Sequence, residues 1–294
     1  MRANVLRALV VGVGVTGVTA CWPFLQTDDT QCATTDDCRA RGASFADTTC
    51  VASVCVAGAV DGGSSTNPAT ACFGHVGAPP TPPAGNVSIT MSFYDEVSPT
   101  TQLSGITVTP CGKLDVTCAA PVASAATSDD SGNATLQIPA GFDGYLEMNG
   151  PTTVPSLWYF SPAPVADASF TVGLLKPTNF AAIAQTVGAS IDPDAGHAFN
   201  FALDCTDTFG KFLAGMSFSS NQTTSETFPF YFIDGLPDTK ATATDTSGIG
   251  GFANLPTGAV TITDAIADAG ARAGSVSVLI RAGTITYSPI APSP

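Results

Sequence analysis

Cysteines and histidines are the residues of this chain whose types and spacing could support chemistry. Its 294 residues include nine cysteines and two histidines. Four cysteines, from Cys32 to Cys55, follow the spacing Cys-x5-Cys-x11-Cys-x4-Cys. Structural zinc sites prefer two to four residues between paired ligands, often with histidine, whereas these gaps are five and four and the segment has no histidine. Disulfide bonds are therefore the favoured chemistry, and no metal or other cofactor is expected.

The two histidines give little support for catalysis. His75 lies in a proline-rich stretch and His197 begins an alternating segment, and neither has a carboxylate three residues further on. The zinc-hydrolase motif H-E-x-x-H and the serine-hydrolase motif G-x-S-x-G do not occur. We therefore expect no catalytic residue, and the chain is predicted not to be an enzyme.

The first twenty residues have the pattern of a secretion signal. Arg2 and Arg7 precede an uncharged apolar run of thirteen residues, 8–20. That run is shorter than the roughly 20 residues that a membrane-spanning helix needs. A basic start, an apolar middle and small residues at the end are typical of a cleaved signal peptide. The sequence therefore predicts export, with cleavage near residue 20.

The residues around the predicted cleavage point carry a resemblance. Val18–Cys21, "VTAC", resembles the lipobox of bacterial lipoproteins, although Val18 stands where leucine is commoner. The resemblance implies lipidation of Cys21 and a membrane anchor in the cell envelope. Trp22 rather than aspartate follows, which favours the outer membrane or the cell surface. The alternative is an ordinary signal peptide with an incidental cysteine at its end.

Eight cysteines remain once Cys21 is set apart, an even number in an oxidising compartment, which favours disulfides. The four in the short segment allow three pairings, and the sequence does not choose among them. Cys111 and Cys118 flank a short loop that a local bridge can close. We predict the pairs Cys32–Cys50, Cys38–Cys55, Cys111–Cys118 and Cys72–Cys205, the last by elimination.

The composition limits both the partners and the fold. The net charge is −14 and only 12% of residues are charged, about half the ~25% of ordinary soluble domains. An acidic surface repels phosphate backbones, so nucleic acid is not expected as a partner. The 29 glycines and 22 prolines indicate an all-β chain with many short strands and turns.

One turn is written twice. Residues 129–141 read "DDSGNATLQIPAG" and residues 245–258 read "DTSGIGGFANLPTG". The alternating segments 87–95 and 197–205 match at an offset of 110 residues, which indicates an internal duplication. Aspartate can accept hydrogen bonds from backbone N–H groups two residues on, and glycine supplies a positive φ. Because no calcium-loop pattern is present, we interpret each copy as a structural hairpin.

The duplicated pattern resembles the carboxypeptidase regulatory-like (transthyretin-like) β-sandwich family. The resemblance implies two tandem transthyretin- or immunoglobulin-like sandwiches and says almost nothing about a ligand. It is carried in the first copy by Leu103, Gly105, Val108, Asp129, Gly132, Pro139, Gly141 and Tyr145, and in the second by Leu213, Gly215, Phe218, Asp245, Gly248, Pro256 and Gly258. The tyrosine is absent from the second copy.

These observations predict six consecutive parts. They are a lipoprotein signal peptide (1–20), a cysteine-rich segment (21–56), a Gly/Ser/Pro linker (57–85), a first sandwich (86–175), a helical connector (176–195) and a second sandwich (196–294).

Two aromatic clusters decide between the functions considered. Trp158 and Tyr159 belong to "LWYF", where strand alternation would bury Trp158 and leave Tyr159 outward, or the reverse. Phe230 and Tyr231 belong to "FPFYF". Aromatic residues bind sugars and peptides when exposed, but sandwich cores need them too. Buried clusters favour an anchored, non-catalytic lipoprotein that acts as a structural or protein-binding module. Exposed clusters favour a glycan- or peptide-binding accessory module of a secreted hydrolase.

Overall fold

The computed structural model describes residue 34 and residues 36–37, 48–51, 54–57, 69–74, 76–77, 81–186, 188–206 and 211–293, with the backbone alone for 48–57. The chain divides into two compact units, Met1–Val60 and Asp61–Pro294. None of the helices in the described ranges is long and apolar enough to cross a membrane.

The first unit contains a short hairpin. Strands β1 (Thr48–Val51) and β2 (Val54–Ala57) pair antiparallel, with Cys50 directly opposite Cys55 in the backbone register. Their predicted partners Cys32 and Cys38 lie outside the described residues, as does Cys21. The pairing in this segment and the lipidation of Cys21 therefore stay predictions.

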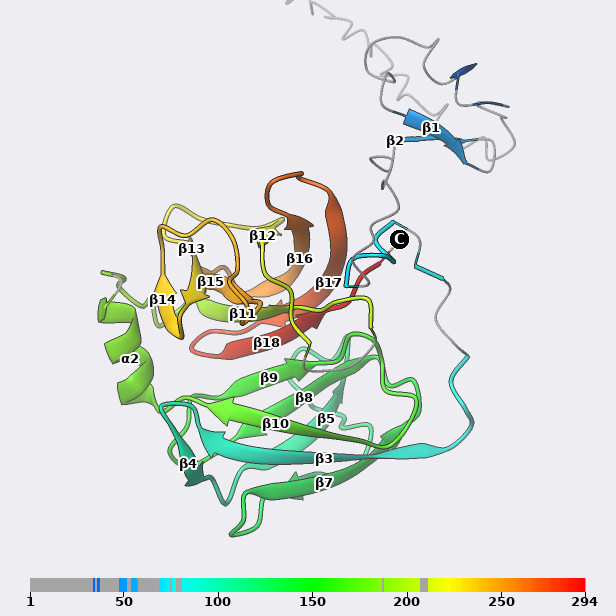
Figure 1. Ribbon diagram of the computed structural model, residues 1–294. Coiled ribbons are helices and arrows are strands. Elements are labelled where there is room, and N and C mark those ends of the chain that lie inside the picture. Colours follow the sequence, from blue (N-terminus) through cyan, green and yellow to red (C-terminus); the bar gives the residue numbers. More distant parts are fainter. Residues whose placement is uncertain are drawn as a thin grey trace, which may run out of the picture. The chain divides into compact units, whose positions relative to one another are not determined.

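The described residues of the second unit form three sheets (Figure 1). The first sheet has β3 at its centre, paired with β10 in parallel and with β4 and β7 antiparallel. Its strands are β3 (Asn86–Asp95), β4 (Ser98–Gln102), β7 (Asn133–Pro139) and β10 (Ala168–Leu174). The third sheet, in the second copy, consists of β12 (Met216–Ser220), β16 (Gly258–Ile266) and β17 (Arg272–Ile280).

The remaining sheet runs through both copies of the duplication. Its order is β14-β13-β15-β11-β18-β9-β8-β5-β6. From the first copy it takes β5 (Thr107–Gly112), β6 (Ala126–Thr127), β8 (Gly144–Asn149) and β9 (Ser156–Tyr159). From the second it takes β11 (Gly196–Ala202), β13 (Phe228–Ile233), β14 (Leu236–Asp238), β15 (Ile249–Leu255) and β18 (Ile285–Ile290). The parallel pair β9–β18 joins the two halves.

This shared sheet has a hydrophobic core on each face. Along β9, Trp158 belongs to one core and its neighbours Leu157 and Tyr159 to the other. Successive side chains on a strand point to opposite faces, so both faces of the shared sheet are covered where the copies meet. The all-β prediction with two sandwiches is confirmed. The two sandwiches, however, share a sheet rather than standing as separate tandem bodies.

The helical connector is also present. Helix α2 (Pro177–Thr186) follows β10 directly. Phe180 and Ile183 pack against the first core, and Ala184 is buried. The connector therefore joins the two copies as a packed element (Figure 1).

Candidate functional site

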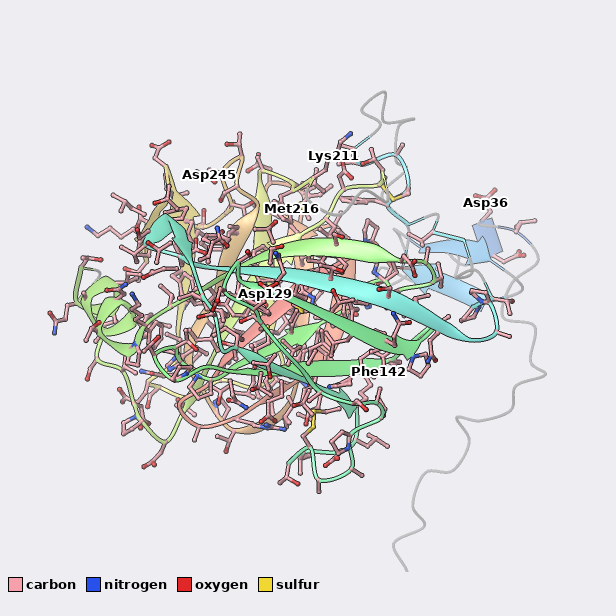
Figure 2. The ribbon with its side chains drawn as sticks, turned by 90° about the horizontal axis from the view of Figure 1, so that it is seen from below. Asp36, Asp129, Phe142, Lys211, Met216 and Asp245 are labelled. Carbon is pink, nitrogen blue, oxygen red and sulfur yellow. A yellow bond between two sulfur atoms is a disulfide. The ribbon has the colours of Figure 1, made fainter. Side chains whose placement is uncertain are left out.

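The duplicated turn is part of the scaffold. In both copies an Asp Oδ1 accepts the N–H of a serine two residues on, at 2.9 Å in Asp129 and 2.8 Å in Asp245. Gly132 and Gly248 have φ angles of 77° and 63°. Both aspartates are marked in Figure 2. Each carboxylate is engaged in capping its own turn, as expected of a structural hairpin.

A second shared feature was not predicted. Ser128 and Thr244 are buried just before the two turns. The Ser128 hydroxyl donates to Leu103 O at 2.8 Å and accepts the Ile106 N–H at 2.9 Å. The Thr244 hydroxyl makes the same pair of bonds to Leu213 O and the Met216 N–H. Hydroxyl residues spaced alike before both turns were the only sequence signal for this clasp.

The four aromatic residues considered as binding candidates are buried. Trp158 and Tyr159 are each 3% exposed, Phe230 is 6% exposed and Tyr231 is 4% exposed. Alternation had predicted that either Trp158 or Tyr159 faces outward. That expectation was wrong because the shared sheet is covered on both faces, so consecutive residues enter different cores.

His197 is held in the interior. It is 1% exposed, and its Nδ1 accepts the Asn254 N–H at 3.3 Å. The Phe180 ring lies 4.7 Å from the imidazole, centroid to centroid. Burial lowers its pKa to about 4, so the imidazole is neutral at physiological pH. A neutral imidazole could act as a base, but burial keeps this one from any substrate. His75 lies outside the described residues.

Two disulfides tie the second unit together. Cys111 pairs with Cys118 and Cys72 with Cys205, the two pairs expected from the sequence outside the cysteine-rich segment. Among the described residues, one group has metal-ligand spacing: Cys111, Cys118 and Glu147. Both thiols are consumed in the disulfide, so this group is not a metal site in the oxidised protein.

Polar side chains cross the seam, defined here as the line where β9 and β18 pair. The Tyr159 hydroxyl accepts the Leu279 N–H at 2.8 Å. Arg281, just after β17, forms an ion pair with Glu147 of β8 and donates to the Tyr145 hydroxyl. Its guanidinium carbon also lies 5.1 Å from the centroid of the Tyr145 ring. Sequence reasoning missed this network because its partners are more than a hundred residues apart.

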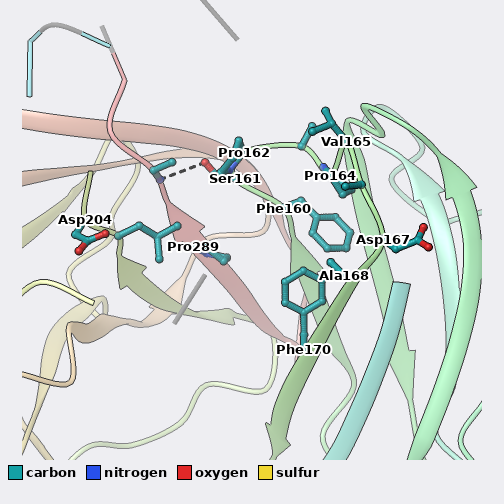
Figure 3. Close-up of a pocket in the computed structure, with 14 residues that line it drawn as sticks. Phe160, Ser161, Pro162, Pro164, Val165, Asp167, Ala168, Phe170, Asp204 and Pro289 are labelled. Atoms are coloured by element: carbon teal, nitrogen blue, oxygen red, sulfur yellow. Dashed lines mark hydrogen bonds between the residues drawn. The ribbon is translucent and has the colours of Figure 1, made fainter. Parts of the chain in front are cut away.

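A pocket opens at one end of the seam (Figure 3). This seam pocket has a volume of about 240 Å³ and takes residues from both copies. Phe160 and Phe170 form one wall, with ring centroids 5.7 Å apart, and Leu203 and Pro289 come from the second copy. Small-molecule pockets usually span ~300–1,000 Å³. The seam pocket therefore suits one or two side chains.

The seam pocket is acidic. Asp167 and Asp204 lie at its two ends, and the described residues that line it include no lysine, arginine or histidine. One oxygen of Asp167 accepts the Ser88 N–H at 2.7 Å, and one oxygen of Asp204 accepts the Thr206 N–H at 2.9 Å. Among the described residues, its polar lining also includes the Ser161 hydroxyl, which accepts the Ala291 N–H at 3.2 Å.

Comparison with known proteins gives little beyond this geometry. No family model and no curated protein matches the chain. Similar solved structures include the Bacillus anthracis TIE protein, with 16% identity and a TM-score of 0.24, covering 71% of this chain and 34% of that one. The chain thus spans about a third of that protein.

Two pilins are also similar. The shaft pilin SpaA from Lactobacillus rhamnosus GG has 12% identity and a TM-score of 0.24, covering 71% of this chain and 98% of that one. GBS52, a minor pilin of Streptococcus agalactiae, has 16% identity and a TM-score of 0.22, covering 71% and 97%. Similarities this weak carry no argument about function.

Proposed function

We propose that this chain is an envelope-anchored, non-catalytic lipoprotein whose two sandwiches act together as one structural or protein-binding module. The observation that supports it most is the nine-stranded sheet shared by both copies. A sheet that continues through the junction resists hinge motion, because bending there would break the β9–β18 ladder. Such a body suits holding a surface at a distance or presenting it to a partner.

The network across the seam supports the same proposal. Arg281 contacts Glu147 and Tyr145 of the first copy, and the Cys72–Cys205 disulfide ties the linker to the second. Enzymes that close on a substrate need loops or domains that move. Here polar contacts fix the two copies to each other, and the disulfide fixes the linker to the second copy.

The alternative, an accessory module that binds glycans through aromatic residues, loses its main support. It required exposed rings at Trp158, Tyr159, Phe230 or Tyr231, and all four are buried. We therefore do not favour it.

Anchoring rests on the lipobox-like residues and is tested directly. The protein is expressed in a bacterium with lipoprotein processing, and cell fractions are probed after labelling with palmitate. We expect wild type in the membrane fraction with label. Cys21→Ser should be unlabelled and soluble, because two acyl chains at ~0.8 kcal/mol per methylene are lost. Thr19→Ser, which keeps the cysteine, is the matched control. A Cys21→Ser protein that stays with membranes contradicts the anchor.

The non-catalytic part has its own test. The mature chain with Cys21→Ser is screened against peptidase, esterase and glycosidase substrates, and no turnover is expected. Turnover that disappears in His75→Ala would overturn this part of the proposal. His197→Ala is a poor probe by itself because the ring is packed in the interior.

A further inference from the structure

The outer edge of strand β10 carries backbone groups with no described partner. β10 ends the first sheet, and its one partner among the described strands is β3 (Figure 1). Leu174 O accepts the Glu96 N–H at 3.1 Å, so the backbone groups of Leu174 face β3. Successive residues of a strand direct these groups to opposite sides, so Ser169 and Thr171 direct theirs away from β3. Both residues are exposed, and their N–H and C=O groups are the donors and acceptors of a sheet edge.

The second copy contains an equivalent strand, β18. Phe93 of β3 and Ala202 of β11 hold the same place in their copies, because each donates its N–H to the carbonyl of the glycine in the duplicated turn, at 2.8 Å and 3.0 Å. This match is displaced by one residue from the match of the two sequences. Phe93 lies opposite Val172 of β10, and Ala202 lies opposite Ile290 of β18. Val172 and Ile290 are therefore equivalent, and so are the strands that contain them.

In the second copy the outer edge of this strand is occupied. β9 pairs with β18 in parallel, with Ser156–Trp158 opposite Ile285–Tyr287. Aligning Ile290 with Val172 places Asp167–Ser169 of the first copy where Ile285–Tyr287 lie in the second. No strand in the described part of the chain covers that stretch of the first copy. The duplicated fold therefore holds a strand at this place in one copy only.

The seam pocket lies against residues 167–171, which we call the open edge. Asp167, Ala168 and Phe170 line the pocket from this side, and Pro289 of β18 lines it from the second copy (Figure 3). A strand laid along the open edge therefore places a side chain over the pocket. The apolar wall and the volume of about 240 Å³ suit an aliphatic side chain such as valine or isoleucine.

The opposite face of the first sheet is rich in hydroxyl groups. Ser88, Thr90 and Ser92 of β3 are partly exposed and alternate with buried residues. Ser169 and Thr171 continue this face on β10. A strand added to the sheet has one side over apolar groups and the other toward hydroxyl groups and solvent. Such a strand should alternate apolar residues with Ser or Thr.

We propose that the open edge binds an extended segment of a partner protein, which pairs with β10 in parallel and alternates apolar with hydroxyl side chains. This segment takes in the first copy the place that β9 takes in the second. Backbone hydrogen bonds give such strand addition its affinity, and pockets for alternate side chains give its specificity. A partner of this kind belongs to the protein-binding role proposed above and rests on it, whereas the anchor and the rigid body do not depend on it.

The β9–β18 pair also gives the orientation of the added strand. Pro155 O accepts the Ile285 N–H at 3.0 Å, so Pro155 and Leu157 direct their backbone groups to β18. Leu157 points into the core of the second copy. In a parallel partner of β10, the residues that face the open edge are accordingly the apolar ones, which point into the seam pocket. An antiparallel partner would face it with its Ser and Thr residues instead.

The partner is a different protein rather than another molecule of this chain. The strand of the second copy that corresponds to β9 is β17, and its outer edge is already bonded. The Leu279 N–H donates to the Tyr159 hydroxyl, and Ala273 O accepts the Ser293 N–H at 2.8 Å. With 10 basic and 24 acidic residues, two molecules of the chain also repel each other.

The test uses the mature chain with Cys21→Ser and a fluorescent probe peptide, Lys-Ser-Val-Thr-Ile-Ser-Val-Lys, whose terminal lysines keep it soluble. Fluorescence anisotropy should show saturable binding between micromolar and millimolar protein. Two control peptides carry N-methyl groups, one on the Val and Ile amides and the other on the Ser and Thr amides. The first should bind at least about tenfold more weakly, because its donors toward β10 are lost. The second should bind as the probe does.

Variants of the protein test the same hydrogen bonds from the other side. Ser169→Pro removes an N–H of the open edge but none of the ladder to β3, and an edge strand tolerates proline. It should weaken binding about fivefold. Ser169→Ala, the matched control, keeps the N–H and should bind as the parent protein does. Thermal unfolding checks that both variants are folded. When the probe binds the parent protein, amide hydrogen exchange should slow at Ser169 and Thr171 and stay unchanged at Phe170.

The proposal is overturned by a probe that shows no saturation up to millimolar protein, or by equal binding of the two control peptides or of the two Ser169 variants. A loss only in the peptide methylated on Ser and Thr also contradicts it, because the pairing would then be antiparallel. So does protection of the Ser169 amide that grows with the concentration of protein alone, since another molecule of the chain would then occupy the open edge. None of these results alters the fractionation or the turnover screen, so failure here is distinguishable from failure of the proposed function.

Discussion

The opening strands of the two copies correspond in sequence but not in burial. Strand β3 alternates along its length, with Ile89, Met91 and Phe93 inward and the residues between them partly exposed. In β11, six of seven residues are buried. The difference arises from their neighbours: β3 lies in an outer sheet, and β11 lies in the shared sheet with a core on each face. Strands that correspond in sequence therefore differ in burial because of what covers them.

The largest expected loss of stability comes from replacing Trp158, and it tests whether the two copies unfold as one body. Trp158 lies between them, with its ring about 6 Å from those of Phe170 in the first copy (6.2 Å) and of Phe201 and Tyr287 in the second (both 6.1 Å). Trp158→Ala should lower the free energy of unfolding by about 4 kcal/mol. Calorimetry should still show one transition for the second unit. Two transitions, with only one shifted, would mean that the copies unfold independently.

The second prediction concerns a position where the copies differ. Met148 of β8 pairs with Val108, and Asp264 of β16 pairs with Phe218 at the corresponding place in the second copy. Asp264 is 1% exposed and its Oδ1 has no hydrogen-bond partner. Burial raises the pKa of its carboxyl from 3.8 to about 7, while the Gly274 N–H and the charge of Arg272 oppose the rise.

The sign of the pH dependence follows from that pKa. Below about pH 4 the Asp264 carboxyl is protonated in both the folded and the unfolded state, so it costs no folding stability. Between about pH 4 and pH 7 the carboxyl ionises only in the unfolded state, so the free energy of unfolding falls as the pH rises. Above pH 7 this loss of stability is complete. Asp264→Asn removes this slope and should gain about 2 kcal/mol at pH 8, less than the full shift because the amide is polar too. Urea unfolding at pH 4 and pH 8 measures it. An equal effect at both pH values would contradict the raised pKa.

Some features of the structure could be predicted from the sequence and others could not. The hairpins at Asp129 and Asp245, the short helix α2 and the disulfides Cys111–Cys118 and Cys72–Cys205 follow from local patterns or from counting. The shared sheet could not be predicted, because nothing local records that β9 pairs with a strand about 130 residues later.

One signal for the shared sheet was nevertheless present. "LWYF" is a continuous hydrophobic run without alternation, and such runs are typical of strands covered on both faces. Interpreting the run as half-buried led to the prediction that either Trp158 or Tyr159 faced outward. The seam pocket could not be predicted either, since Phe160 and Pro289 meet only after the sheet forms.

A third prediction tests whether the buried hydroxyls of Ser128 and Thr244 stabilise the two copies equally. Ser128→Ala and Thr244→Val each remove a buried hydroxyl that donates to one backbone group and accepts from another. Because both groups lose their partner, each change should cost about 1.5 kcal/mol. Chemical denaturation measures both variants. Similar losses would support an equivalent role in the two copies, and a loss in only one would show that the clasp matters in that copy alone.

The smallest expected loss of stability comes from removing the hydroxyl of either of two buried tyrosines, Tyr159 and Tyr231. The Tyr159 hydroxyl of the first copy accepts the Leu279 N–H of the second at 2.8 Å, whereas the Tyr231 hydroxyl accepts the Phe218 N–H within the second copy at 3.0 Å. Burial raises the pKa of both hydroxyls, so both stay neutral at physiological pH. Tyr159→Phe and Tyr231→Phe should each cost about 1 kcal/mol of folding stability.

The free energy of unfolding cannot distinguish these two variants, but amide hydrogen exchange can. Tyr159→Phe should speed exchange at Leu279, and Tyr231→Phe should speed it at Phe218 instead. If Tyr159→Phe leaves the Leu279 amide as protected as in wild type, that bond does not hold the copies together, and the shared sheet, the Arg281 contacts and the packing of Trp158 must do so.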